Sequence, residues 1–168
     1  MGIRVFCCAV VFCCAALTGL ELRRRLFVRL RSLQYFREYF RFVRSNISHY
    51  GMSLEDIAKE HKPGEQLPGF TAILRENIQQ QPFASAFADA LRVMQTSLGL
   101  TEEDRAALCA VVNRIGGADT DGALEVLQAA DEQLSERIAG AKEQCETEGK
   151  LRVVLALSGG AVAALLLL

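Results

Sequence analysis

The sequence lacks two features that would indicate a sheet or an active site. No useful stretch alternates apolar and polar residues with a period of two, the pattern of a half-buried strand, so an all-α fold class is predicted. Histidine is scarce, with His49 and His61 as the two examples in 168 residues, and neither has metal-ligand spacing. The motifs of phosphate-binding loops, nucleophile elbows and zinc proteases are absent as well. We therefore expect a protein that is not an enzyme, with no catalytic residue, cofactor or metal.

Charged side chains are missing from two segments of 16 residues each, Val5–Leu20 and Val153–Leu168. A helix of 16 residues spans about 24 Å, and neighbouring residues can extend it toward the roughly 30 Å of a hydrocarbon core. The residues between the segments have an ordinary globular composition. We therefore predict an N-terminal transmembrane anchor over 1–21, a helical bundle domain in the cytoplasm over 22–150, and a C-terminal transmembrane helix over 151–168, in the cell membrane.

Basic residues flank the inner ends of both segments. They are Arg23, Arg24, Arg25, Arg29, Lys150 and Arg152. Because such clusters stay on the cytoplasmic side of a membrane, we expect both termini on the outside and a first segment that is not cleaved. The alternative is a signal peptide that is removed, which leaves a secreted helical protein. Ser158, Gly159 and Gly160 give the second segment a small-residue face, which indicates helix–helix association and is compatible with a homo-oligomer.

Four cysteines of the first segment, Cys7, Cys8, Cys13 and Cys14, form a CC-x4-CC pattern that could hold a metal. Successive residues of a helix point about 100° apart, so one helix offers a poor tetrahedral set of thiolates. Cysteine also packs as a small apolar residue, and we interpret these four in that way. The run Asp119-Thr-Asp-Gly122 resembles the start of a calcium loop, but it lacks the later ligands, so we interpret it as a loop that closes on a helix N-cap.

Apolar residues spaced three and four apart predict one amphipathic helix from Leu22 to Tyr50. They are Leu26, Leu30, Leu33, Phe36, Phe40, Val43, Ile47 and Tyr50. Eight arginines occupy the other faces of this helix, with aromatic residues between them. An arginine-rich helix of this kind could bind nucleic acid. Its first turns follow a membrane anchor, however, so we favour contact with anionic membrane lipid and expect no nucleic acid partner.

Caps and breakers divide the rest of the central region into five further helices. Ser53 and Thr101 have the sequence context of N-caps, and Pro82 suits a first helical turn. The pair Gly116-Gly117 is expected to end a helix with a residue in the left-handed conformation. The expected ranges are 54–62, 70–81, 82–98, 102–115, and 120 onward into the final segment.

The last long helix is acidic. Between Glu102 and Glu148 the chain has 12 acidic residues against four basic ones. We expect this helix to lie antiparallel to the basic first helix, because both are tied to the same membrane face. Glu125, Glu132 and Glu136 are the candidate partner-facing residues, since anionic membrane surfaces repel them. The alternative interpretation is that these acids only solvate the helix and neutralise the first one.

Several short motifs follow one another in a characteristic order along the whole chain. They are Thr18-Gly19, Leu30-Arg-Ser-Leu-Gln34, Leu54-Glu-Asp-Ile57, Leu67-Pro68, Gly116-Gly117-Ala118-Asp119 and Gly149-Lys150-Leu151. Together with the two hydrophobic ends, they make the chain resemble the stage III sporulation protein AB family of bacterial membrane proteins. The cytoplasmic domain of that family is similar to the helical domain of the type II secretion platform protein, the F protein.

The resemblance implies a non-enzymatic membrane scaffold in the secretion-like channel complex that links mother cell and forespore and is needed for endospore formation. It implies a location in the mother-cell membrane around the forespore, with the main domain in the cytoplasm. It further implies that a partner ATPase, similar to stage III sporulation protein AA, docks on the helical domain beside other channel components. The family offers no catalytic residues to carry over. The residues themselves leave open a membrane-anchored helical sensor or regulator with a ligand pocket between its helices.

Overall fold

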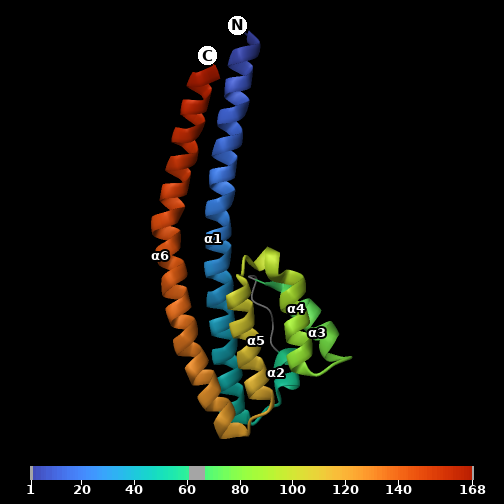
Figure 1. Cartoon of the computed structure of the whole chain (residues 1–168). Helices are drawn as coiled ribbons and strands as arrows, with labels where there is room; N and C mark the ends of the chain where they lie inside the picture. The colour runs from blue at the N-terminus through green and yellow to red at the C-terminus, as the bar shows by residue number, and fades with distance from the viewer. Residues whose placement is uncertain (1, 61–66, 168) are drawn as a thin grey trace. The chain divides into compact units, whose positions relative to one another are not determined.

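A computed structural model describes residues 2–60 and 67–167 of the chain (Figure 1). Within these residues there are six helices and no strand, which confirms the all-α prediction. The helices are α1 Gly2–Tyr50, α2 Leu54–Glu60, α3 Pro68–Ile78, α4 Phe83–Leu98, α5 Glu102–Gly116 and α6 Thr120–Leu167. The predicted end of the short helix near Lys62 lies outside the described residues.

The chain divides into two compact units. The helical unit is Arg29–Ile138, and the end unit combines residues 1–28 with residues 139–168. The two long helices, α1 and α6, each contribute one part to each unit, whereas α2 to α5 belong wholly to the helical unit. The first turns of the helical unit therefore belong to α1 and its last turns belong to α6.

The core of the helical unit is built on the apolar stripe of α1. The stripe residues that are at least nine-tenths buried are Leu33, Phe36, Phe40, Val43 and Ile47. Their spacing of three and four residues predicts this burial correctly. The last member of the predicted stripe, Tyr50, is 76% exposed. That part of the prediction is wrong, because α1 ends at Tyr50 and the chain turns at Gly51, where φ is +59°.

Aromatic rings join α1 to α3 and α4 around Phe87 of α4, which has no exposed surface. The centroid of its ring lies 5.9 Å from that of Phe36 in α1 and 5.3 Å from that of Phe70 in α3, in edge-to-face geometry. Phe40 of α1 stacks on the same ring at 6.3 Å. Such pairs contribute about 0.5–1.5 kcal/mol each beyond the burial of their surface. The cluster therefore fixes how α1 packs against α3 and α4.

Two tyrosines widen the buried face of α1 beyond the predicted stripe. Tyr35 and Tyr39 are 5% and 2% exposed, and the ring of Tyr39 stacks on Phe87 with 6.5 Å between centroids. Burial raises the pKa of Tyr35 to about 12 and raises the pKa of Tyr39 as well. Both phenols are therefore neutral at physiological pH and belong to the core.

Local caps determine where the helices of this unit begin. The N–H of Asp56 donates to Oγ of Ser53 at 3.2 Å, as expected of an N-cap. Thr101 forms a complete capping box at the start of α5. The N–H of Gly122 donates to Oδ1 of Asp119 at 3.1 Å, so this aspartate closes the start of α6. The capping interpretation of these residues is confirmed in each case.

Three expectations about helix ends are wrong. Gly117 ends α5 with φ of −106°, which is not left-handed, and Gly116 still belongs to the helix. The left-handed C-cap lies instead at Gly99 after α4, with φ of +62°. Pro82 is the N-cap of α4 and not a residue of its first turn. The helix expected at 70–81 is α3, which begins two residues earlier and ends three residues earlier, since its last residues form a turn.

The end unit consists of the first part of α1 and the last part of α6. Figure 1 shows these two segments side by side, with the N and C labels at the same end of the unit. Ala141 and Cys145 of α6 are buried, whereas Leu17 of α1 is 66% exposed. Within the described residues, the structure contains no helix that is both long and apolar enough to cross a membrane. Most side chains of Val5–Leu20 and Val153–Leu168 lie outside the described set.

Candidate docking surface and the ion pairs behind it

Asp104, in the first turn of α5, is the centre of a polar network inside the helical unit. Its side chain has no exposed surface. Arg29 of α1 donates from Nε to Oδ2 at 2.7 Å and from Nη2 to Oδ1 at 3.2 Å. Arg137 of α6 donates from Nη1 to Oδ1 at 3.1 Å, and the N–H of Thr101 donates to Oδ2 at 3.2 Å. One carboxylate therefore joins α1, α5 and α6 and also completes the cap of α5.

The electrostatics of Asp104 follow from these partners. Burial disfavours the charged form, but the hydrogen bonds from Arg29 and Thr101 outweigh burial and hold the pKa of this carboxyl below its usual value. The group is therefore ionised at physiological pH. A buried charge of this kind is tolerated because its oxygens are fully hydrogen-bonded and oppositely charged groups surround it.

Asp131, near the middle of the helical unit's part of α6, binds two arginines of α1. Arg37 Nε donates to Oδ1 at 2.8 Å and Arg41 Nε donates to the same oxygen at 2.6 Å. Their Nη2 atoms reach Oδ2 at 3.2 Å and 3.0 Å. The hydrogen bonds from Arg41 and Arg37 hold the pKa of Asp131 well below its usual value. Asp131 is 24% exposed, so water reaches this pair of ionic contacts.

These contacts fix the relative direction of the two long helices within the helical unit. Near the end of α1, Arg44 donates to Gln128 at 3.1 Å, close to the start of α6. Nearer the start of α1, Arg29 shares Asp104 with Arg137, which lies further along α6. The prediction that the acidic helix lies antiparallel to the basic one is therefore confirmed for this unit.

The arginine run after the first hydrophobic segment is exposed. Arg23–Arg25 belong to the end unit and all three are solvent-accessible. Nε of Arg25 lies 3.6 Å from Glu21, and the guanidinium of Arg23 lies 5.5 Å from the ring centroid of Phe27. Contacts between exposed side chains on one helix are weak. These weak contacts leave all three arginines exposed to solvent.

Arg29, grouped with that run in the sequence analysis, has a different place. Its side chain is 18% exposed and is held by Asp104 in the helical unit. The structure thus gives it an internal contact that the sequence analysis did not anticipate. The side chains of Lys150 and Arg152, the other two predicted flanking residues, lie outside the described residues.

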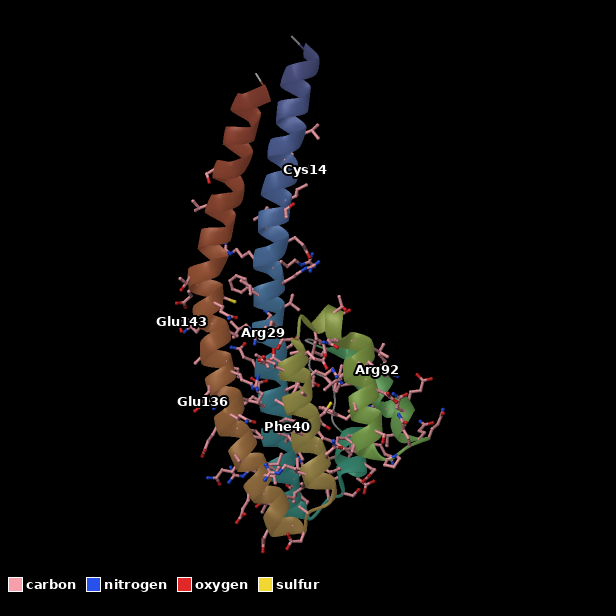
Figure 2. All side chains as sticks on the ribbon, viewed as in Figure 1. Cys14, Arg29, Phe40, Arg92, Glu136 and Glu143 are labelled. Atoms are coloured by element: carbon pink, nitrogen blue, oxygen red, sulfur yellow. The ribbon has the colours of Figure 1, made fainter. Side chains whose placement is uncertain are left out.

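The three candidate partner-facing acids all lie on the outside of α6. Glu125, Glu132 and Glu136 are exposed, and Figure 2 shows Glu136 projecting from this helix. In the part of the chain that the structure describes, none of the three is in an ion pair, in contrast to Asp131 on the inner side of the same helix. On α6, Asp131 therefore faces inward and binds α1, whereas these three acids face solvent.

A groove of about 260 Å³ lies between α5 and α6 on this outer side. Val111 and Arg114 line it from α5. The residues that line it from α6 are Val126, Ala129, Ala130, Glu132, Gln133 and Glu136. Two of the three candidate acids thus border a partly apolar depression, which the sequence analysis did not predict.

A larger cleft of about 620 Å³ opens where several helices of the unit begin or end. Ile47, Phe83 and Ile115 give it apolar walls, and its charged lining residues are Glu55 and Asp119. Asp119 is occupied in capping α6.

Metal ligands do not gather in the described residues, which contain no group of three His, Cys, Asp or Glu side chains able to hold an ion. Cys13 and Cys14 are exposed and free, whereas the side chains of Cys7 and Cys8 lie outside the described set. Burial raises the pKa of the Cys109 thiol, which keeps it protonated and makes it a poor nucleophile.

Sequence reasoning missed Asp104 and Asp131, although both positions carry a signal. Each is an acid on an otherwise apolar helical stripe. Asp104 lies four residues before buried Leu108, and Asp131 lies between buried Leu127 and Leu134 at spacings of four and three. An acid on a core-facing stripe requires a hydrogen-bonding partner of opposite charge, and the arginines of α1 supply one to both residues.

The fold and these surfaces define a class of protein: an all-α protein whose helical unit has ionic contacts between its helices and, among the described residues, exposed acids on α6 outside any ion pair. Within that class the particular family follows from comparison. The profile of stage III sporulation protein AB matches residues 4–168. The chain therefore belongs to the stage III sporulation protein AB family and is a sporulation component. Comparison with curated proteins and with solved structures gives no match.

Proposed function

We propose that this protein is a non-enzymatic membrane scaffold of the channel complex between mother cell and forespore, and that its helical unit docks a partner ATPase. The observation that carries the proposal is the division of the acids on α6. Asp131 is held by two arginines of α1, whereas Glu125, Glu132 and Glu136 are exposed and outside any described ion pair. Charges that are not needed to hold the fold are available to a partner.

Membership of the family supports the sporulation part of this proposal. The expected partner is an ATPase similar to stage III sporulation protein AA, together with other channel components. Within the described residues, ion pairs join neighbouring helices or side chains of one helix, and we assign no catalytic group to the chain. The role is therefore one of assembly, in which a rigid helical surface recruits the protein that hydrolyses nucleotide.

The membrane attachment is part of the same proposal. Two segments without a charged residue, Val5–Leu20 and Val153–Leu168, flank the central region, and the exposed run Arg23–Arg25 suits an anionic lipid surface. We place the protein in the mother-cell membrane around the forespore, with the helical unit in the cytoplasm and both termini on the other side. A reporter fused after Leu168 tests this topology, and activity confined to the cytoplasm contradicts it.

The cleavage alternative has a separate test. Intact mass of the protein extracted from membranes should equal that of the full chain. Loss of about 20 residues, as expected for removal of a signal peptide, would show instead a secreted helical protein.

The docking proposal is tested by charge reversal on the outer side of α6. Glu125→Lys with Glu132→Lys should leave insertion and folding unchanged, because exposed charges contribute little to stability. It should weaken co-purification of the partner ATPase from detergent and block sporulation at the engulfed-forespore stage. A matched control is Glu60→Lys with Glu76→Lys, which reverses two exposed acids of α2 and α3. Normal partner binding and normal spore yield in the α6 variant would falsify the acidic-face proposal.

A further inference from the structure

We propose that the groove between α5 and α6 is a docking slot for a basic amphipathic helix of the partner, with small aliphatic side chains seated in the groove and Lys or Arg facing Glu132 and Glu136. This inference rests on the proposed function, because it names the part of the partner that docking on the helical unit uses. It commits to one occupant, a helix of the opposite charge.

The walls and floor of the groove indicate what it accepts. Val111 and Ala130 are 8% and 2% exposed and form a closed apolar base, while Ala129 is exposed at the rim. Because alanines leave room where larger residues would fill it, the depression between the helices stays open. Short aliphatic side chains fit such a floor, in the manner of helices that lay an apolar face into a groove.

The volume argues for side chains and against a metabolite. Small-molecule sites in proteins commonly enclose about 300–1,000 Å³, and this groove has about 260 Å³. It is also open on the outer side of two helices. A space of this size accepts a few side chains presented by a larger surface.

The acidic residues at the rim of the groove favour a partner helix with positive charge. Glu132 and Glu136 lie one helical turn apart on the same side of α6, and both line the groove. Arg114 on the opposite wall is a single positive charge, so acids are in excess. Glu125 extends the acidic side by two further turns. A helix with basic residues three or four positions apart matches these two glutamates, and its approach is accelerated by the acidic surface.

The groove is held rigid from behind. Asp131, next to the floor residue Ala130, is bound to Arg37 and Arg41 of α1. The other wall is held because Asp104 ties the start of α5 to α1 and α6. A surface that is already ordered loses less conformational entropy on binding. The inner ionic contacts therefore prepare the outer groove for a partner.

The first test uses the full chain in detergent and a defined probe. The probe is a labelled synthetic 16-residue helix with alanine and valine on one side and arginine at positions three and four apart, compared with the same peptide carrying glutamate for arginine. We expect salt-sensitive binding of the arginine peptide only. Ala129→Leu, which fills the groove without changing charge, and Glu132→Lys with Glu136→Lys should each weaken it at least tenfold.

Two controls make this test specific. Ala72→Leu places the same side chain on an exposed alanine of α3, and Glu60→Lys with Glu76→Lys changes the net charge equally elsewhere. Both should leave peptide binding within about twofold of the parent. Equal binding of both peptides overturns the inference, because the charge of the peptide then plays no part. Equal effects of Ala129→Leu and Ala72→Leu also overturn it, because the groove then plays no part.

The second test repeats the variants with the partner ATPase similar to stage III sporulation protein AA. Loss of ATPase binding in Ala129→Leu and in the glutamate reversal supports the slot and the proposed function together. Loss in the glutamate reversals alone, with Ala129→Leu unaffected, overturns the slot and leaves the proposed function standing. If the groove variants impair the peptide but none of the acid reversals impairs the ATPase, the ATPase proposal fails. If Ala129→Leu instead abolishes self-association, the occupant is a second copy of the chain and the inference is wrong.

Discussion

Asp104 and Asp131 are two carboxylates that each bind two arginines, and they differ in their access to water. Asp104 has no exposed side-chain surface and its arginines are 18% and 29% exposed. Asp131 is 24% exposed, and Arg41 beside it is 56% exposed. Asp104 joins three helices and caps one of them, whereas Asp131 joins α1 and α6 alone. The same chemical pairing therefore has two physical settings in one helical unit.

The difference in exposure indicates which of the two ionic contacts contributes more to the stability of the fold. An exposed ion pair gains little over hydration and is screened by salt. A buried charge that loses its partners pays the full desolvation penalty, so each partner of a buried pair becomes indispensable to the others. We therefore expect Asp104 to act as a lock between α1, α5 and α6, and Asp131 to act as a weaker guide for the direction of α6.

The largest expected effect is that of Asp104→Asn. The change removes the charge that two part-buried guanidinium groups share, and loss of one partner in a buried pair typically destabilises a protein by about 3 kcal/mol or more. Urea unfolding of the full chain in detergent, followed by circular dichroism, measures this loss. A loss below about 1 kcal/mol would mean that Asp104 behaves like a surface residue and that burial does not separate the two carboxylates.

Acid should remove both contacts. The folded pKa of each carboxyl lies below its unfolded value of about 3.9, since hydrogen bonds from arginines favour the charged form. Their stabilisation is therefore fully present above about pH 4 and is lost as the pH falls through the folded pKa. Stability measured against pH should be flat near neutrality and decline only in strong acid. In Asp104→Asn and in Asp131→Asn the acid-induced decline should be smaller, and an unchanged decline in both variants contradicts the assignment.

A third substitution distinguishes the ionic contacts of Asp104 from its role in the N-terminal cap of α5. Thr101→Ala removes the side-chain acceptor for the N–H of Asp104, a contact of 3.1 Å, and leaves the arginine contacts in place. Loss of an N-cap of this kind typically destabilises by about 1 kcal/mol. Hydrogen exchange should increase in the first turn of α5 and stay unchanged near Arg29 and Arg137. Equal exchange at all three places would show that capping, and not the ionic lock, explains Asp104.

Much of the fold is predictable from the sequence because the apolar spacing and the caps are local signals. The stripe from Leu33 to Ile47 and the N-caps Ser53 and Thr101 follow from residues within a few positions of each other. Helix ends are less predictable. Gly99 is a left-handed C-cap whereas Gly117 is not, although both are glycines that directly follow a helix.

The site is predictable only in part, since it depends on contacts between distant segments. That α6 is acidic and α1 basic indicates that they attract, but not which acids turn inward. Asp131 and Glu132 are neighbours, yet Asp131 binds α1 and Glu132 borders the groove with α5. Successive residues of a helix point about 100° apart. Asp131 therefore lies on the buried side of α6 with Leu127 and Leu134, and Glu132 points away from it. The groove itself requires α5, whose position no local pattern gives.

The smallest expected effect is that of Asp131→Asn, and its dependence on salt is more informative than its size. Because water reaches Asp131 and Arg41, the variant should lose less than about 1 kcal/mol. Raising the ionic strength from about 0.1 M to 1 M shortens the screening length from about 10 Å to about 3 Å, so the parent should approach the stability of the variant in high salt. The gap between parent and Asp104→Asn should persist under the same conditions, because no salt ion reaches a carboxylate without exposed surface. If salt closes both gaps alike, the two carboxylates are equivalent and the ordering of lock and guide is wrong. If it closes only the gap at Asp131, burial is what distinguishes them, and the arginines of α1 divide in the same way, with Arg29 holding the fold and Arg41 adjusting it.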